Sequence, residues 1–195
     1  MKQILNLSFL CFALIVLLCA CGHGNGELSG QQPLTIDPEI TKKMSEPKLV
    51  QKDDLFEMKL NITKTTFKVD EPIVYSTSLT YIGEQKSFTI WGPETYIGFY
   101  LTDGKKLRMD GASTMELMST KLIRGETLEF PFSKSGGYGS KDPDADFWKK
   151  FYSEKDLLLP PGTYLIAASC NFSLTQEVVD SHYKGEVYTT ITVVE

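Results

Sequence analysis

The sequence has 195 residues, of which 42% are hydrophobic and 23% are charged, so it suits one folded domain with a sizeable core rather than several domains. The formal net charge is −5, and only Arg108 and Arg124 are arginines, so the surface repels nucleic acid and has few bidentate clamps for phosphate. We therefore expect no nucleic-acid partner.

The first residues have the three-part pattern of a secretory signal. Lys2 is followed by an almost unbroken apolar run from Ile4 to Leu18 and then by small residues. This run is shorter than the ~20 residues of a transmembrane helix. The tetrapeptide Leu-Cys-Ala-Cys that ends at Cys21 resembles the lipobox of bacterial lipoprotein precursors. The resemblance implies cleavage between Ala20 and Cys21, lipid on the Cys21 sulfur, and a place at the extracytoplasmic face of the cell membrane.

This cleavage predicts three regions of the chain. Residues 1–20 are the lipoprotein signal peptide, 21–52 a lipidated flexible tether, and 53–195 the folded domain. The tether is predicted from its Gly, Gln, Pro, Ser, Lys and Glu content, with hydrophobic residues only scattered through it. Loss of the signal removes Lys2 and changes the formal charge from −5 to −6. The predicted membrane attachment therefore depends on lipid and not on basic side chains.

The four cysteines provide a consistency test of the lipobox. Cys11 and Cys19 would leave with the signal and Cys21 would carry lipid, so Cys170 would have no partner within the chain. Cys170 follows an apolar run, and free cysteine is among the most buried residue types. We therefore expect a buried, inert thiol, whereas the alternative is an exposed reactive one.

The rest of the chain alternates short apolar segments with turn residues. Apolar and polar residues alternate with period two after Leu55, and Asp103-Gly104 is a strong hairpin signal. The predicted strands are residues 56–62, 73–81, 87–91, 96–102, 107–109, 127–132, 163–172 and 187–194. About seven to nine such strands indicate an all-β fold, an Ig-like antiparallel β-sandwich.

One insertion interrupts this pattern with a short helix. Asp142 can cap it, Pro143 suits its first position, and the aromatic segment from Phe147 to Tyr152 follows. The alternative is a calcium loop, because aspartates at every second position open such loops. The glycine and closing glutamate that the loop requires are missing, so we favour capping.

Three short segments resemble the framework of known β-sandwich families. They are 69–73 (Val-Asp-Glu-Pro-Ile) before a strand, 128–132 in mid-chain, and 159–164 (Leu-Pro-Pro-Gly-Thr-Tyr) at the start of a late strand. Their layout is similar to bacterial Ig-like extracellular domains and to the intracellular proteinase inhibitor family (BsuPI type). In Greek-key sandwiches a tyrosine placed like Tyr164 bonds the preceding corner through its hydroxyl, so we expect a framework role for it. The inhibitory loops of the family have no residue-by-residue match in this sequence.

The segment from Ser133 to Lys155 combines glycines, charges and aromatic side chains. Loops on a rigid sandwich often carry binding, and aromatic residues are common anchors of protein interfaces. The predicted contacts with an envelope protein are Tyr138, Phe147, Trp148 and Tyr152. The alternative is that these aromatics only close one end of the sandwich.

Residues for catalysis are scarce. After cleavage His23 and His182 are the two histidines, and no Gly-x-Ser-x-Gly motif is present. We therefore expect no enzymatic activity, no cofactor and no metal, and a non-catalytic envelope lipoprotein that serves as a binding or accessory module. One alternative is a proteinase-inhibitor-like module that acts through exposed loops. A second is a metal-handling protein that uses soft thioether ligands, for which the sequence offers Met109, Met115 and Met118.

Overall fold

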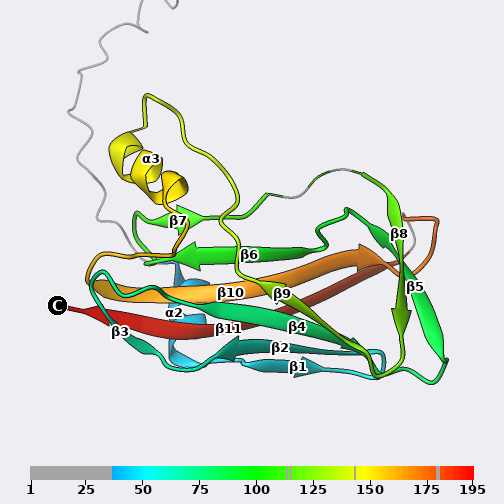
Figure 1. Ribbon diagram of the computed structural model, residues 1–195. Coiled ribbons are helices and arrows are strands. Elements are labelled where there is room, and N and C mark those ends of the chain that lie inside the picture. Colours follow the sequence, from blue (N-terminus) through cyan, green and yellow to red (C-terminus); the bar gives the residue numbers. More distant parts are fainter. Residues whose placement is uncertain (1–36, 113, 115, 143, 179–180) are drawn as a thin grey trace, which may run out of the picture. The chain divides into compact units, whose positions relative to one another are not determined.

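The computed structural model describes residues 37–112, 114, 116–142, 144–178 and 181–195, and they form an all-β sandwich of two sheets (Figure 1). The first sheet has the order β1 (Val50–Lys52), β2 (Phe56–Ile62), β4 (Tyr75–Tyr81) and β9 (Thr127–Pro131). The second has the order β3 (Thr66–Lys68), β11 (His182–Val194), β10 (Gly162–Ser173), β5 (Ser87–Gly92) and β8 (Met118–Ile123). Strand β6 (Ile97–Thr102) also pairs with β10, and β7 (Arg108–Met109) pairs with β6. The predicted fold class is confirmed.

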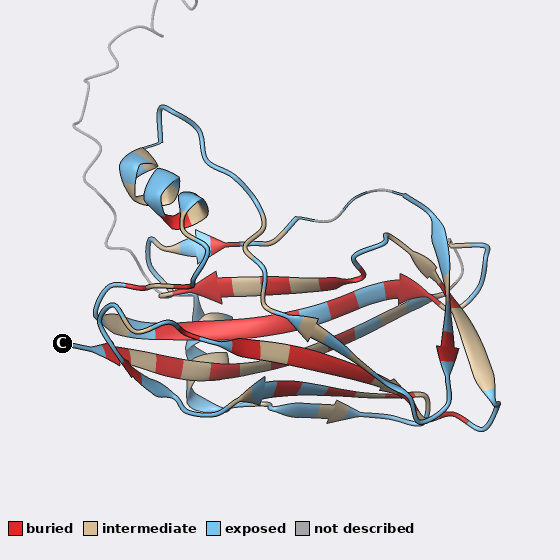
Figure 2. Ribbon diagram, viewed as in Figure 1, coloured by how far each residue is buried: buried red, intermediate tan, exposed pale blue. Residues whose placement is uncertain are grey.

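Alternation of side chains places the core between the sheets. In β2 the residues Phe56, Met58 and Leu60 are buried, while the side chains between them face outward. Figure 2 shows red bands that alternate with tan or pale blue ones along β2 and β11. All eight predicted strands are present, and the hairpin after Asp103 is formed by β6 and β7.

The longest pairing in the molecule joins β10 to β11. Their antiparallel register runs from Gly162 opposite Val193 to Ser173 opposite His182. Five consecutive residues of β10, 164–168, are buried, so both faces of this strand are covered. The first sheet covers one face. The other face is covered by helix α2 (Pro38–Ser45), which Figure 1 shows behind β10 and β11.

Helix α2 and strand β1 lie within residues 21–52, so the predicted flexible tether is too long. Residues 37–52 belong to the folded domain, and residues 21–36 lie outside the described part of the chain. Asp37 caps α2 by accepting a hydrogen bond from the Glu39 backbone at 2.8 Å, with Pro38 in the first turn. Lys43 forms an ion pair with Glu186 of β11 at 2.8 Å. A helix that lies on the surface has the same polar composition as a flexible tether, so composition did not distinguish the two.

Further differences concern short strands. The described residues form eleven strands and two helices, of which strands β1, β3 and β8 were not predicted. Strands β1 and β3 have three residues each, too few to show a period of two, and β8 has mostly exposed residues. Strand β11 begins at His182, earlier than predicted, and β3 pairs with it in parallel. In the described part of the chain, neither helix is long and apolar enough to cross a membrane.

Cys170 lies in the core, as predicted. Its side chain is on β10 opposite Gly185, and the residue is only 1% exposed. Burial raises the pKa of the Cys170 thiol to about 12, so it is protonated and unreactive at neutral pH.

Tyr164 makes the predicted corner contact. Its hydroxyl donates to the carbonyl oxygen of Pro160 at 2.8 Å, which ties the start of β10 to the turn before it. Tyr75 differs, because its hydroxyl is the one buried side-chain polar atom of the described residues that has no hydrogen-bond partner.

These two tyrosines form a matched pair for mutagenesis. We expect Tyr164→Phe to lower the free energy of unfolding by about 1 kcal/mol, because the corner loses its hydrogen bond. We expect Tyr75→Phe to raise it by about 1 kcal/mol, because an unpaired buried hydroxyl is removed. Urea unfolding followed by tryptophan fluorescence measures both. Equal destabilisation by the two changes would contradict the corner role.

Candidate functional site

Helix α3 (Ala145–Ser153) is the predicted helical insertion, and it projects beside β7 (Figure 1). Its N-cap is Asp144, whose side chain makes no capping hydrogen bond. The prediction that Asp142 caps it is wrong: the Asp142 carboxylate accepts a hydrogen bond from the Gly139 backbone at 2.6 Å and closes the loop before the helix. Pro143 lies outside the described residues. The helix therefore begins later than the sequence indicated.

A lysine holds the other end of α3. The Lys134 ammonium donates to three backbone carbonyl oxygens, those of Phe151 at 2.6 Å and of Glu154 and Asp156 at 2.7 Å. A positive charge at a helix C-terminus also interacts favourably with the helix dipole. Partial burial lowers the pKa of Lys134, while Glu154 and Asp156 act in the opposite direction. Sequence reasoning missed this contact, because no local pattern links residues so far apart.

The structure brings all four predicted contact residues into one aromatic cluster. Phe151 is 3% exposed and belongs to the core, and Phe147, Trp148 and Tyr152 pack around it half-buried. Tyr138 is 42% exposed and stacks on Tyr152 with a centroid distance of 6.3 Å. The cluster therefore closes part of the sandwich and also presents aromatic surface to solvent.

Two pockets flank Phe147. The term α3 surface is used below for these two pockets together with the aromatic cluster. One pocket, of about 240 Å³, lies toward the Asp103 turn and Tyr164. The other, of about 300 Å³, lies toward the turn at Asp70. Both are lined by Phe147 and Pro160, so the phenyl ring forms a ridge between two hollows. Such relief, with apolar walls and charged rims, can accept side chains of a protein partner.

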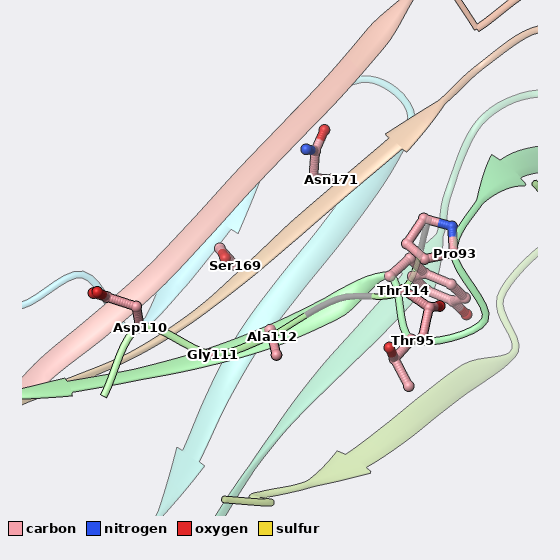
Figure 3. Close-up of a pocket in the computed structure, with 10 residues that line it drawn as sticks. Pro93, Thr95, Asp110, Gly111, Ala112, Thr114, Ser169 and Asn171 are labelled. Atoms are coloured by element: carbon pink, nitrogen blue, oxygen red, sulfur yellow. The ribbon is translucent and has the colours of Figure 1, made fainter. Parts of the chain in front are cut away.

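A separate polar pocket of about 280 Å³ lies over β6 and β10 (Figure 3). Figure 3 shows Ser169 and Asn171 along β10, with Asp110 on one side and Thr95 and Thr114 on the other. The lining offers hydroxyl, amide and carboxylate groups, which can hydrogen-bond a polar group. Among the described residues that line it there is no histidine or cysteine to act as a nucleophile or base.

Other candidate residues are dispersed. His182 starts β11 opposite Ser173 and is exposed, rather than lying in a connection. Met109 is buried, whereas Met118 is 46% exposed, and Met115 lies outside the described residues. No group of three or more His, Cys, Asp or Glu in the described ranges is arranged to hold a metal ion. Ala20 and Cys21, the predicted cleavage and lipidation residues, lie in the undescribed N-terminal part.

Comparison with known proteins gives no family and two weak structural similarities. No protein-family model and no curated protein matches the sequence. The chain is similar to the sporulation control protein Spo0M of Bacillus subtilis, with 13% identity, a TM-score of 0.34, and coverage of 72% of this chain and 50% of that protein. It is also similar to a β-glucosidase of Listeria innocua, with 14% identity, a TM-score of 0.26, and coverage of 72% and 17%. The chain thus spans half the length of Spo0M and 17% of the length of the β-glucosidase.

The aromatic cluster predicts a contrast between two of its members. We expect Phe151→Ala to lower the free energy of unfolding by about 3–5 kcal/mol, because it leaves a cavity in the core. We expect Tyr138→Ala to change it by less than about 0.5 kcal/mol, because Tyr138 is exposed. Chemical unfolding of both variants measures the difference. A large loss with Tyr138→Ala would show that this ring has a mainly structural role.

Proposed function

We propose that the protein is a non-catalytic lipoprotein of the bacterial cell envelope, anchored through Cys21 and binding a protein partner through the α3 surface. The observation that carries the anchor is the Leu-Cys-Ala-Cys sequence directly after a single lysine and a short apolar run. Two or more acyl chains at Cys21 make attachment stable, since one chain binds only marginally.

The start of the folded domain shortens the proposed tether. Because α2 begins at Pro38, only residues 21–36 connect Cys21 to the described domain. A chain of that length spans at most about 55 Å even when fully extended. The lipid anchor would therefore keep the domain close to the membrane, where its partners would be membrane or envelope proteins.

The α3 surface is the best candidate for contact with such a partner. It combines the exposed Tyr138, the half-buried Trp148 and two adjoining hollows, and aromatic rings next to pockets are typical of interface anchors. Helix α3 is held in place by the hydrogen bonds of Lys134 to its C-terminal end and by Phe151, which packs in the core. A surface held rigid in this way loses little entropy when it binds.

The anchor predicts the behaviour of a Cys21→Ser variant. Without the sulfur there is no lipidation, so the full-length precursor should fail to incorporate labelled palmitate and should keep its signal. Gel mobility and palmitate labelling in a bacterial host measure both effects. Cys19→Ser is the matched control and should be processed normally, because it keeps a small residue there. Normal labelling of the Cys21→Ser chain would overturn the proposal.

The partner contact predicts site-selective crosslinking. A benzophenone amino acid in place of Tyr138 should give one discrete adduct with an envelope protein in living cells. The same group in place of the exposed Asp54, in the β1–β2 turn at the other end of the sandwich, is the control (Figure 1). An identical adduct pattern at both sites, or none at Tyr138, would contradict binding through the α3 surface.

A further inference from the structure

Strand β8 is an edge strand with few of the usual protections. In the described part of the chain it pairs only with β5, so its other edge has unpaired backbone groups. Proteins guard such edges with short strands or proline. Strands β1 and β3 have three residues and β7 has two, and β9 ends in Pro131. Strand β8 has six residues without proline or glycine, and its one charged side chain, a further kind of edge protection, is Lys121.

Exposed apolar side chains gather on the same strand and on the residue just before it. Leu117, Met118 and Ile123 are 57%, 46% and 44% exposed. Leu122 lies between them, is 4% exposed, and fixes the strand to the core. Figure 2 shows β8 as mostly exposed surface with one buried band. This combination of a free edge and apolar side chains favours pairing with another strand.

The sequence around β8 is complementary to itself when two copies run antiparallel. With Thr120 facing Thr120 of a second copy, residues at equal distances on either side lie opposite each other and on the same face. The resulting pairs are Glu116 with Arg124, Leu117 with Ile123, Met118 with Leu122, and Ser119 with Lys121. One charge pair and two apolar pairs thus occur on each side of a two-fold axis.

Neighbouring registers lose this match. Centring the pair on Lys121 puts two lysines directly opposite each other and Met118 opposite Arg124. Centring it on Ser119 puts Glu116 opposite Leu122. A shift by one residue would place core-facing side chains opposite exposed ones. Only the Thr120 register pairs opposite charges and like apolar residues.

We propose that two copies of this chain form a symmetric dimer through antiparallel pairing of β8, centred on Thr120. The dimer joins the two β5–β8 sheets across the axis and buries Leu117 and Ile123 against each other. Arg124 donates one long hydrogen bond, 3.4 Å, to the Glu84 carbonyl oxygen, and a guanidinium has four further N–H donors for Glu116 of the second copy. This inference is independent of lipidation and of the α3 surface.

Cysteine crosslinking of the full-length chain tests the register. Thr120→Cys should give a disulfide-linked dimer under mild oxidation, because directly opposite residues lie within disulfide range. Ile123→Cys is the control, because in this register the two copies of residue 123 lie about 20 Å apart. The parent chain gives the background from its native cysteines. Equal crosslinking of both variants, or none at Thr120→Cys, overturns the proposal.

A reciprocal charge exchange gives a second test that does not depend on oxidation chemistry. In detergent solution, sedimentation should show that Glu116→Arg and Arg124→Glu each weaken the dimer by about fivefold or more, since the axis repeats each pair. The double variant should restore it. Within one chain these residues are about 25 Å apart along an extended strand, so rescue can only act between copies. A monomeric parent chain, or no rescue, overturns the proposal.

Discussion

The pairing of β10 with β11 is the constraint on which the rest of the structure depends. It is the longest ladder in the molecule, and its central residues are buried on both faces. The first sheet can cover only one face of a strand, so a second layer is required on the other. Helix α2 supplies that layer through the Lys43–Glu186 ion pair and a hydrogen bond from Thr190 to the Met44 carbonyl oxygen. The segment before the predicted domain is thus part of the folded domain, as a surface layer over β10 and β11.

Strand β10 also separates the two ends of the folded domain. On one side of β10 the partner changes from β6, which pairs with residues 165–170, to β5, which meets it only at Ser173. The chain between β5 and β6 leaves the ladder, and the β5–β8 pair continues as a separate arm whose outer edge is unpaired among the described residues. At the start of β10, the Tyr164 corner supports the α3 surface. The proposed partner surface and the proposed dimer edge therefore do not compete.

The local sequence signal for a helix start does not say at which of its occurrences a helix is capped. The Asp-Pro signal of a helix start holds at Asp37-Pro38, where the carboxylate caps α2, but not at Asp142, whose carboxylate closes a loop instead. Both dipeptides look alike in sequence. The structure chooses between them because α2 has a buried sheet face to cover, whereas the Gly139 backbone lies within reach of Asp142.

The sequence by itself determined which side chains of the main strands face the core, since the period of two is a local property of extended chain. It also determined the buried Cys170 and the Tyr164 corner, which follow from neighbours a few residues away. Only the tertiary structure decided the docking of α2, the anchoring of α3 by Lys134 and the free edge of β8. These depend on contacts between distant segments, and no local pattern encodes which face or edge is left for another segment to cover.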